Sequence, residues 1–147
     1  MSGGTPISRP GAPPGSGLLL AGLVVLAGCS GGSGGGVIPS TGSVTLIDVQ
    51  AQVFSPRCAL SGCHIGPTPQ MDLDLSAGNS AGNTIGVSSE ELPVLLRIEP
   101  GNAADSYLYM KLIEDPRILG DPMPASGGPL SAGQLNLIES WIDQGAM

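Results

Sequence analysis

The stretch RCALSGCHIG, residues 57–66, contains two of the chain's three cysteines and its only histidine. Four residues separate Cys58 from Cys63, and His64 follows the second cysteine directly. Two thiols and an imidazole this close together suit a covalently attached cofactor or a soft metal ion. Alternatively, the two thiols form a disulfide, whose small ring is geometrically possible, beside an unrelated histidine. The remainder of the chain has to distinguish these interpretations.

The N-terminal part of the chain predicts export and membrane anchoring. Residues 18–28 are an uninterrupted run of apolar and small side chains. The run is shorter than the roughly 20 residues that span a bilayer, and it is typical of the hydrophobic region of a signal peptide. It leads into LAGC, residues 26–29, which resembles the lipobox of bacterial lipoproteins. This resemblance implies a signal peptide over residues 1–28 and a lipid anchor on Cys29, and Ser30 favours the outer over the inner membrane.

The composition changes sharply after this anchor. Residues 29–42 are rich in glycine and serine and predict a flexible tether, so one folded domain is expected over residues 43–147. All twelve acidic residues and four of the five basic residues lie in this domain. Its acidic character argues against nucleic acid and favours basic protein partners. With only four aromatic side chains, the domain also has a thin core for its size.

Three segments show the apolar periodicity of helices. They cover residues 45–55, residues 104–114 and the stretch from Ser131 to Gly145. Ser43 is a candidate cap for the first helix, which Pro56 is expected to end because proline lacks the backbone donor. In the third helix, the spacing of Ser131 and Gln134 predicts a capping box. The sequence therefore predicts a mostly α fold with few helices.

The connecting segments are long and rich in glycine and proline. Residues 71–76, MDLDLS, alternate apolar and acidic side chains, which predicts an extended segment with its apolar side chains on one side. Residues 92–98, LPVLLRI, are compatible with a short helix or a strand, and residues 120–130, GDPMPASGGPL, predict a loop. Long loops in a small domain are normally functional or wrap around a bound group.

A thiol pair followed by an imidazole is what covalent haem attachment requires. Two thioether bonds hold the haem, and the adjacent histidine coordinates the iron. Most haem-attachment motifs have two residues between the cysteines, whereas this chain has four. The Ser61-Gly62 pair gives the longer loop the freedom to bulge.

The sixth iron ligand has to be another kind of side chain, because His64 is the only histidine. Methionine sulfur, Lys111 or an open position remain. Met123 is favoured because prolines on both sides restrict its backbone and so direct its side chain. Met71 and Met110 lie instead at spacings typical of core residues.

The motifs together form an ordered set over residues 44–146. The set comprises a helix leading into the cysteines, PGN and SYLYMKL over residues 100–112, the MP and GGPLS loop, and LIESWIDQGA at residues 137–146. It resembles the small c-type cytochrome domains of exported lipoproteins and planctomycete-type cytochromes of environmental bacteria. The resemblance implies a class I cytochrome c-like fold, with N- and C-terminal helices crossing beside the haem and long loops around it.

The resemblance also implies specific residue roles. Cys58 and Cys63 would carry one covalent haem c, and His64 and Met123 would be the axial ligands of its iron. Trp141 would pack on the haem side of the core. The haem itself would supply the apolar bulk that the thin core lacks.

The expected function is single-electron transfer by an exported protein that faces the periplasm. Partners would be redox proteins with a basic docking face, together with the membrane that holds the lipid on Cys29. The sequence presents no nucleophile with a neighbouring base, so it predicts no enzyme acting on its own.

Two other functions compete with this one. The first is a haem-free binding or structural lipoprotein module braced by a Cys58–Cys63 disulfide. The second is a copper site built from the two thiols, the imidazole and a methionine thioether. Zinc is disfavoured because structural zinc prefers four nitrogen or thiolate ligands.

Overall fold

The computed structural model describes residues 42–147. The predicted signal peptide (residues 1–28), the lipidation site Cys29 and nearly all of the predicted tether (residues 29–42) therefore lie outside the described residues. Within residues 42–147, every helix is too short or too polar to cross a membrane.

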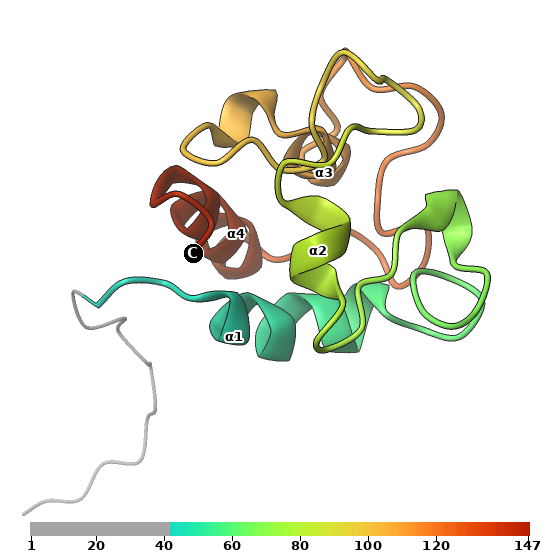
Figure 1. Ribbon diagram of the computed structural model, residues 1–147, viewed down its shortest axis with the longest axis horizontal. Helices are drawn as coiled ribbons and strands as arrows, with labels where there is room; N and C mark the ends of the chain where they lie inside the picture. The colour runs from blue at the N-terminus through green and yellow to red at the C-terminus, as the bar shows by residue number, and fades with distance from the viewer. Residues whose placement is uncertain (1–41) are drawn as a thin grey trace, which may run out of the picture. The chain divides into compact units, whose positions relative to one another are not determined.

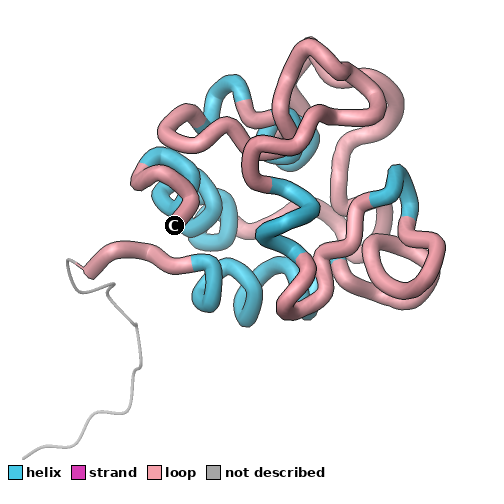
Figure 2. Tube along the Cα trace, viewed as in Figure 1, coloured by secondary structure: helices cyan, strands magenta, loops and turns pink. Residues whose placement is uncertain are grey.

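Helices are the only regular elements longer than a single bridge in this described part, so the mostly α prediction is confirmed. In chain order they are α1 (Leu46–Val49), η1 (Gln50–Cys58), η2 (Gln70–Asp72), α2 (Ser80–Thr84), η3 (Ala103–Asp105), α3 (Tyr107–Leu112) and α4 (Ala132–Asp143). Figure 1 shows α1 at the start of the described chain lying beside α4 at its end, and the two helices are in contact. Figure 2 shows that long loops join the remaining short helices.

The cap of the first helix differs from the prediction. Thr45, not Ser43, is the N-cap: its side chain accepts from the Asp48 N–H at 3.4 Å, and the Asp48 carboxylate accepts from the Thr45 N–H at 2.9 Å. Ser43 instead donates its hydroxyl to Gln144 Oε1 at 2.9 Å. The two reciprocal hydrogen bonds of Thr45 and Asp48 cap the helix more effectively than Ser43 alone would. Ser43 instead links the start of the domain to the end of α4 through its hydrogen bond to Gln144.

The prediction that Pro56 ends the first helix is wrong. The π-helix η1 follows α1 directly and contains Pro56 before it ends at Cys58. Its last turn is closed by the Ala59 N–H, which donates to the Phe54 carbonyl at 2.7 Å. In this wider turn the bonding partner lies five residues back rather than four, which accommodates the proline ring where an α-turn would clash. Cys58 is therefore the last residue of the helix rather than the first residue of the following loop.

The predicted second helix is divided in two. The 3-10 helix η3 and the α-helix α3 are separated at Ser106, whose hydroxyl donates to the Asn102 carbonyl at 2.9 Å and accepts from the Glu99 N–H. A serine side chain that bonds nearby backbone groups in this way competes with helical hydrogen bonds. The break at Ser106 therefore makes η3 and α3 two separate helices.

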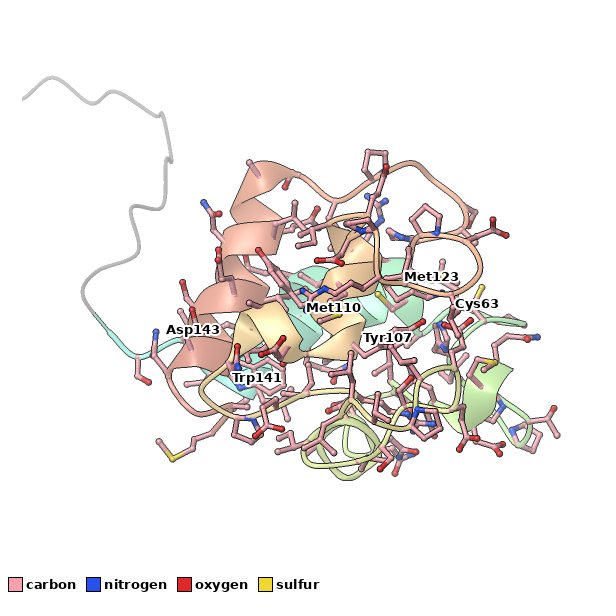
Figure 3. All side chains as sticks on the ribbon, turned by 90° about the horizontal axis from the view of Figure 1, so that it is seen from above. Cys63, Tyr107, Met110, Met123, Trp141 and Asp143 are labelled. Atoms are coloured by element: carbon pink, nitrogen blue, oxygen red, sulfur yellow. The ribbon has the colours of Figure 1, made fainter. Side chains whose placement is uncertain are left out.

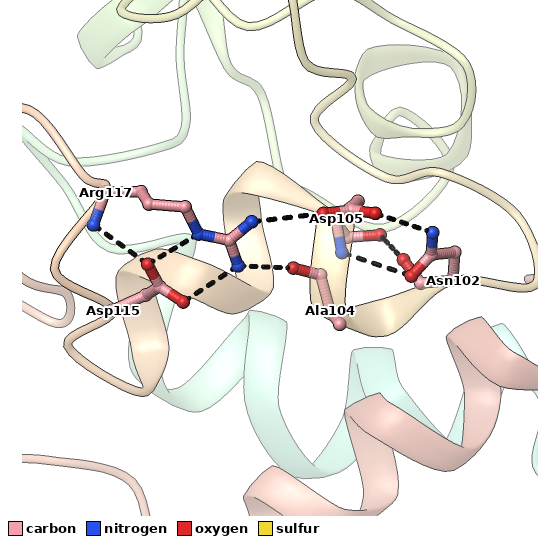
Figure 4. A network of polar contacts seen from close by, with 6 residues as sticks. Asn102, Ala104, Asp105, Asp115 and Arg117 are labelled. Atoms are coloured by element: carbon pink, nitrogen blue, oxygen red, sulfur yellow. Dashed lines mark hydrogen bonds and ion pairs between the residues drawn. The ribbon is translucent and has the colours of Figure 1, made fainter.

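An exposed ion-pair network holds the segment after α3 against η3 (Figure 4). The guanidinium of Arg117 donates to both carboxylate oxygens of Asp115 at 2.9 Å, to Asp105 at 3.1 Å and to the Ala104 carbonyl at 2.9 Å. The bonds to Arg117 lower the pKa of Asp115 to about 2. The Arg117–Asp105 pair is exposed on both sides and contributes little to stability, whereas Asp115 is mostly buried and binds Arg117 through both carboxylate oxygens.

The third predicted helix is confirmed as α4. Ser131 and Gln134 make the capping box: the Gln134 N–H donates to Ser131 Oγ at 3.3 Å, and the Ser131 N–H donates to Gln134 Oε1 at 3.1 Å. Ile138, Trp141 and Ile142 on its inner face are fully buried. This face packs against α1 and supplies much of the core.

The connecting segments agree only in part with the predictions. Residues 120–130 form a loop, as expected, and residues 92–98 contribute two isolated bridges rather than a helix or a strand. The segment 71–76 is extended only from Leu73 onward, because Gln70–Asp72 forms the 3-10 turn η2. Met71 and Asp72 have left-handed backbone angles, φ 57° and 46°, which the alternation of residue types does not predict.

The aromatic pair of Phe54 and Trp141 joins η1 to α4. Their rings meet edge to face, with centroids 6.2 Å apart, and both side chains are fully buried. Replacing Trp141 with alanine is expected to lower the free energy of unfolding by about 3–5 kcal/mol, because it removes this contact and leaves a cavity. Urea unfolding measures the loss. Ile47→Ala, at a side chain that is 79 % exposed, is the control, with a change within about 0.5 kcal/mol, and a Trp141→Ala loss of similar size would contradict this description of the core.

Candidate functional site

The four predicted haem-contact residues line one cavity of about 520 Å³. They are Cys58, Cys63, His64 and Met123, and each is half-buried. Figure 3 shows Cys63 and Met123 at the same end of the domain, although 60 positions in the sequence separate them. The volume falls in the range of cofactor pockets. The fold therefore brings both parts of the predicted site to one space.

Apolar side chains from several elements complete the cavity. They are Phe54, Leu73, Leu75, Leu108, Leu112 and Pro124. Sequence reasoning did not assign these residues to the site, although the alternation over residues 71–76 already placed two of the leucines on one side. A wall of this kind excludes water from a large apolar ligand.

The loop between the cysteines is folded back on itself. The His64 N–H donates to the Cys58 carbonyl at 3.2 Å, and the Cys63 N–H donates to the Leu60 carbonyl at 2.9 Å. Gly62 has φ +81°, a conformation that favours glycine. The four-residue spacer is thus taken up by a tight turn, which returns His64 to the end of η1.

The His64 ring is held by a backbone carbonyl. Its Nδ1 lies 3.2 Å from the carbonyl oxygen of Gln70. A carbonyl only accepts, so this contact places the proton on Nδ1 and leaves the lone pair of the neutral ring on Nε2. Burial lowers the pKa of the ring, whereas the carbonyls of Gln70 and Leu73 oppose that shift and the charge of Arg97 adds to it. A neutral imidazole with a fixed tautomer is the form that coordinates iron.

The two thiols are free and are not joined in a disulfide. Burial raises the pKa of Cys58 from 9.0 to about 11, although the nearby Arg57 acts in the opposite direction. A thiol with this pKa stays protonated at neutral pH and is protected from adventitious oxidation. The alternative of a Cys58–Cys63 disulfide is therefore not the arrangement of this structure.

The Cys58 thiol is expected to react slowly with alkylating agents in folded, haem-free protein. At pH 8 its rate with iodoacetamide should be about a hundredfold below that of the same thiol in urea, because only the thiolate reacts and the pKa is about two units higher. The rate should rise with pH up to about 11. Peptide mapping after timed alkylation measures it, and equal rates in the folded and unfolded chain would contradict the burial of this thiol.

The loop that carries Met123 is held by hydrogen bonds at several points along its length. The Met123 N–H donates to the Lys111 carbonyl at 2.8 Å. Further along, the Arg57 guanidinium donates to the carbonyls of Gly127 and Gly128 at 3.1 and 2.6 Å. Arg57 directly precedes Cys58. The short segment that carries the first thiol therefore also holds the loop of Met123, the predicted distal (sixth) ligand of the iron.

A polar cluster forms another part of the cavity wall. Lys111 Nζ donates to the Leu119 carbonyl at 2.6 Å and pairs with Glu91 Oε2 at 2.7 Å, and the Tyr107 hydroxyl donates to the same Glu91 oxygen at 2.8 Å. Lys111 and Tyr107 are buried. Lys111 was an alternative distal ligand, but its ammonium group is held by these two acceptors.

The other methionines and Trp141 lie in different surroundings. Met110 is fully buried in the core and does not line the cavity, as its helical spacing predicts. Met71 does line the cavity, but its side chain is 46 % exposed, so the core position expected for it is wrong. Trp141 does not line the cavity; it contacts the cavity residue Phe54 instead.

The copper alternative would need both thiols and the imidazole around one ion. Among the side chains of residues 42–147, no group of three or more His, Cys, Asp or Glu residues is arranged to hold a metal ion. The structure instead arranges these groups around a larger cavity.

Comparisons of this chain with protein-family models, with curated proteins and with solved structures gave no match.

Proposed function

We propose that this chain is an exported, lipid-anchored c-type cytochrome that binds one haem c and transfers single electrons. Cys58 and Cys63 would carry the haem through thioether bonds, and His64 and Met123 would be the axial ligands of its iron. The observation that carries the proposal is the single cavity lined by both thiols, the only imidazole of the chain and the proline-flanked methionine. The class I cytochrome c-like fold is part of the same proposal, supported by the contact between α1 and α4.

The residues around the cavity fit a haem chemically. Phe54 and the leucines offer an apolar wall, and the Nδ1 contact with Gln70 leaves Nε2 of His64 available for the iron. When bound, the haem would supply the ferric–ferrous couple, and histidine–methionine ligation favours the reduced state. The protein's part is to hold the two ligands, exclude water and set the polarity of the site.

The charge of the domain favours a basic redox partner. Three acidic and three basic side chains line the cavity, so the acidic excess belongs to the domain as a whole rather than to the cavity wall. The net negative charge of the domain would steer a basic donor or acceptor and raise the rate of encounter. Electron exchange with an added cationic redox protein should therefore slow as the salt concentration rises.

A redox titration of the matured protein tests the proposed function. The domain is expressed behind a secretion signal together with haem-maturation proteins, and its visible spectrum is followed against the applied potential. We expect one reversible one-electron wave and a sharp band of low-spin reduced haem. A colourless protein, or one whose spectrum does not respond to reduction, would contradict the proposal.

Anchoring at Cys29 is tested separately. Cys29→Ser in the full chain should release a soluble protein with an unchanged visible spectrum, because the lipid is attached to this sulfur and two or more acyl chains are what hold a protein stably at a membrane. Cell fractionation with immunoblotting measures the distribution. Continued membrane retention of a variant that has lost residues 1–28 would contradict the lipobox interpretation and leave the haem proposal intact.

A further inference from the structure

Arg97 is a buried cation beside the cavity. Its side chain is only 8 % exposed, and it lines the cavity. Its backbone is fixed at both ends: the Arg97 N–H donates to the Val87 carbonyl at 2.6 Å, and its carbonyl accepts from the Leu108 N–H at 2.9 Å. Burying a guanidinium is costly unless its donors are used, so its partners indicate its role.

The guanidinium binds backbone carbonyls rather than a carboxylate. Nη2 donates to the Met71 carbonyl at 2.7 Å, and Nη1 donates to those of Asn83 at 2.9 Å and Asp72 at 3.3 Å. The carboxylate paired with it, that of Glu90, is 3.9 Å away, and the Glu90 side chain is 58 % exposed. The planar fork of arginine thus joins the turn at residues 71–72 to the end of α2.

The turn that Arg97 holds is conformationally unfavourable. Met71 and Asp72 both have left-handed backbone angles, which side chains other than glycine adopt rarely. Such angles persist only where surrounding contacts enforce them. The two hydrogen bonds from Arg97 to the carbonyls of these residues are such contacts.

The same turn begins with the residue that orients His64. The carbonyl of Gln70, directly before Met71, lies 3.2 Å from His64 Nδ1. The Gln70 N–H in turn donates to the Cys63 carbonyl at 2.9 Å. A shift of residues 71–72 would therefore move the group that fixes the imidazole.

On the basis of the proposed haem function, we infer that Arg97 is a positioning residue for His64, the proposed proximal ligand of the iron. By holding the left-handed turn at Met71 and Asp72, Arg97 keeps the Gln70 carbonyl against the His64 ring. Arg97 acts through this turn and not as an iron ligand. The geometry of the fork is the required property, because Nη1 and Nη2 reach carbonyls at different positions, whereas the single ammonium nitrogen of lysine lacks this fixed planar spacing.

The test measures hydrogen exchange at the His64 ring. The chain has one histidine, so the matured, reduced protein labelled with ¹⁵N has a single histidine ring N–H to follow by NMR, apart from the indole N–H of Trp141. The variants are Arg97→Lys, which keeps the charge, and Arg97→Gln, which removes it. Arg117→Lys is the control, because Arg117 binds carboxylates and a carbonyl at the exposed network and not at the cavity.

We expect the ring N–H to exchange at least tenfold faster in both Arg97 variants and at the parent rate in Arg117→Lys. Arg97→Lys with the parent exchange rate would overturn the inference, because charge alone would then suffice. Covalent haem is measured in the same samples. If the parent protein carries none, the proposed function fails and the inference fails with it; if the parent carries haem and Arg97→Lys exchanges normally, only the inference fails.

A rescue experiment separates backbone support from charge and from misfolding. Asp72→Gly added to Arg97→Lys should restore slow exchange in part, because glycine adopts the left-handed angle without strain. Asp72→Ala, which removes the same carboxylate but keeps Cβ, should not restore it. Equal rescue by glycine and alanine, or rescue by neither, would overturn the role of the turn.

Discussion

Replacing His64 with glycine is expected to lower the yield of covalent haem at least tenfold and to abolish the low-spin spectrum of what remains. No other imidazole exists in the chain, and the His64 N–H donates a hydrogen bond to the Cys58 carbonyl. The His64 ring is therefore the nitrogen ligand that the proposal assigns to the iron. Losses of this order accompany disruption of metal ligation in proteins. Haem staining of denaturing gels and visible spectroscopy measure the two effects.

Added imidazole provides a specific check on the role of His64. In the glycine variant the vacated space should admit free imidazole and restore the low-spin spectrum of the residual pigment. Gln70→Ala is the matched control, because it removes an exposed side chain but keeps the carbonyl that accepts from the ring. A glycine variant with the parent spectrum in the absence of imidazole would contradict the assignment of His64.

Replacing Met123 with alanine should leave the haem attached but lower its reduction potential by on the order of 0.1 V, because axial ligands tune the potential over a wide range. The open position should also bind carbon monoxide and imidazole, which the parent protein should resist. The loop itself should persist, because it is held by the Met123 backbone and by Arg57 rather than by the thioether. Redox titration and ligand-binding spectra measure both effects.

Two other methionines serve as controls for the distal assignment. Met110→Leu alters a fully buried core residue away from the cavity, and Met71→Leu alters a cavity residue with an exposed side chain. Neither should change the potential or open the iron. If Met71→Leu reproduced the effect of Met123→Ala, the distal ligand would be Met71 and the present assignment would be wrong.

The parts of the fold that local sequence determines were predictable. The capping box at Ser131 and the apolar stripe through Trp141 specify α4 because both act within one helix. The loop at residues 120–130 follows from its prolines and glycines. Met123 was selected for the same local reason, and it does line the cavity with the cysteines and histidine.

The parts that depend on distant residues were not predictable. The alternation of MDLDLS indicates an extended segment, but bonds from Arg97, more than twenty positions away, accompany a left-handed turn at Met71 and Asp72. The sequence likewise offers Lys111 only as an alternative iron ligand, whereas Glu91 and the Leu119 carbonyl hold it in the cavity wall. Secondary-structure propensity depends on neighbouring residues and therefore does not reveal such distant partners.

The passage of the helix through Pro56 has a similar explanation. Proline in a helical pattern normally marks its end, yet the π-helical turn of η1 continues to Cys58. The bond from Ala59 to the Phe54 carbonyl that closes it depends on how the chain turns into the cysteine loop. Cys58, the first of the two proposed attachment residues, therefore lies at the end of a helix rather than in the loop that sequence rules suggest.

Intact-protein mass spectrometry under denaturing conditions shows whether the chain carries a covalent haem. The matured chain without residues 1–29 should retain the mass of one haem after acid–acetone extraction, and digestion should localise that mass to the peptide that contains Cys58 and Cys63. Cys58→Ala and Cys63→Ala, each alone, should show whether one thioether suffices. A parent chain with the mass of the bare polypeptide, or of the polypeptide less two hydrogens from a disulfide, would contradict the claim that this cavity holds a covalent haem.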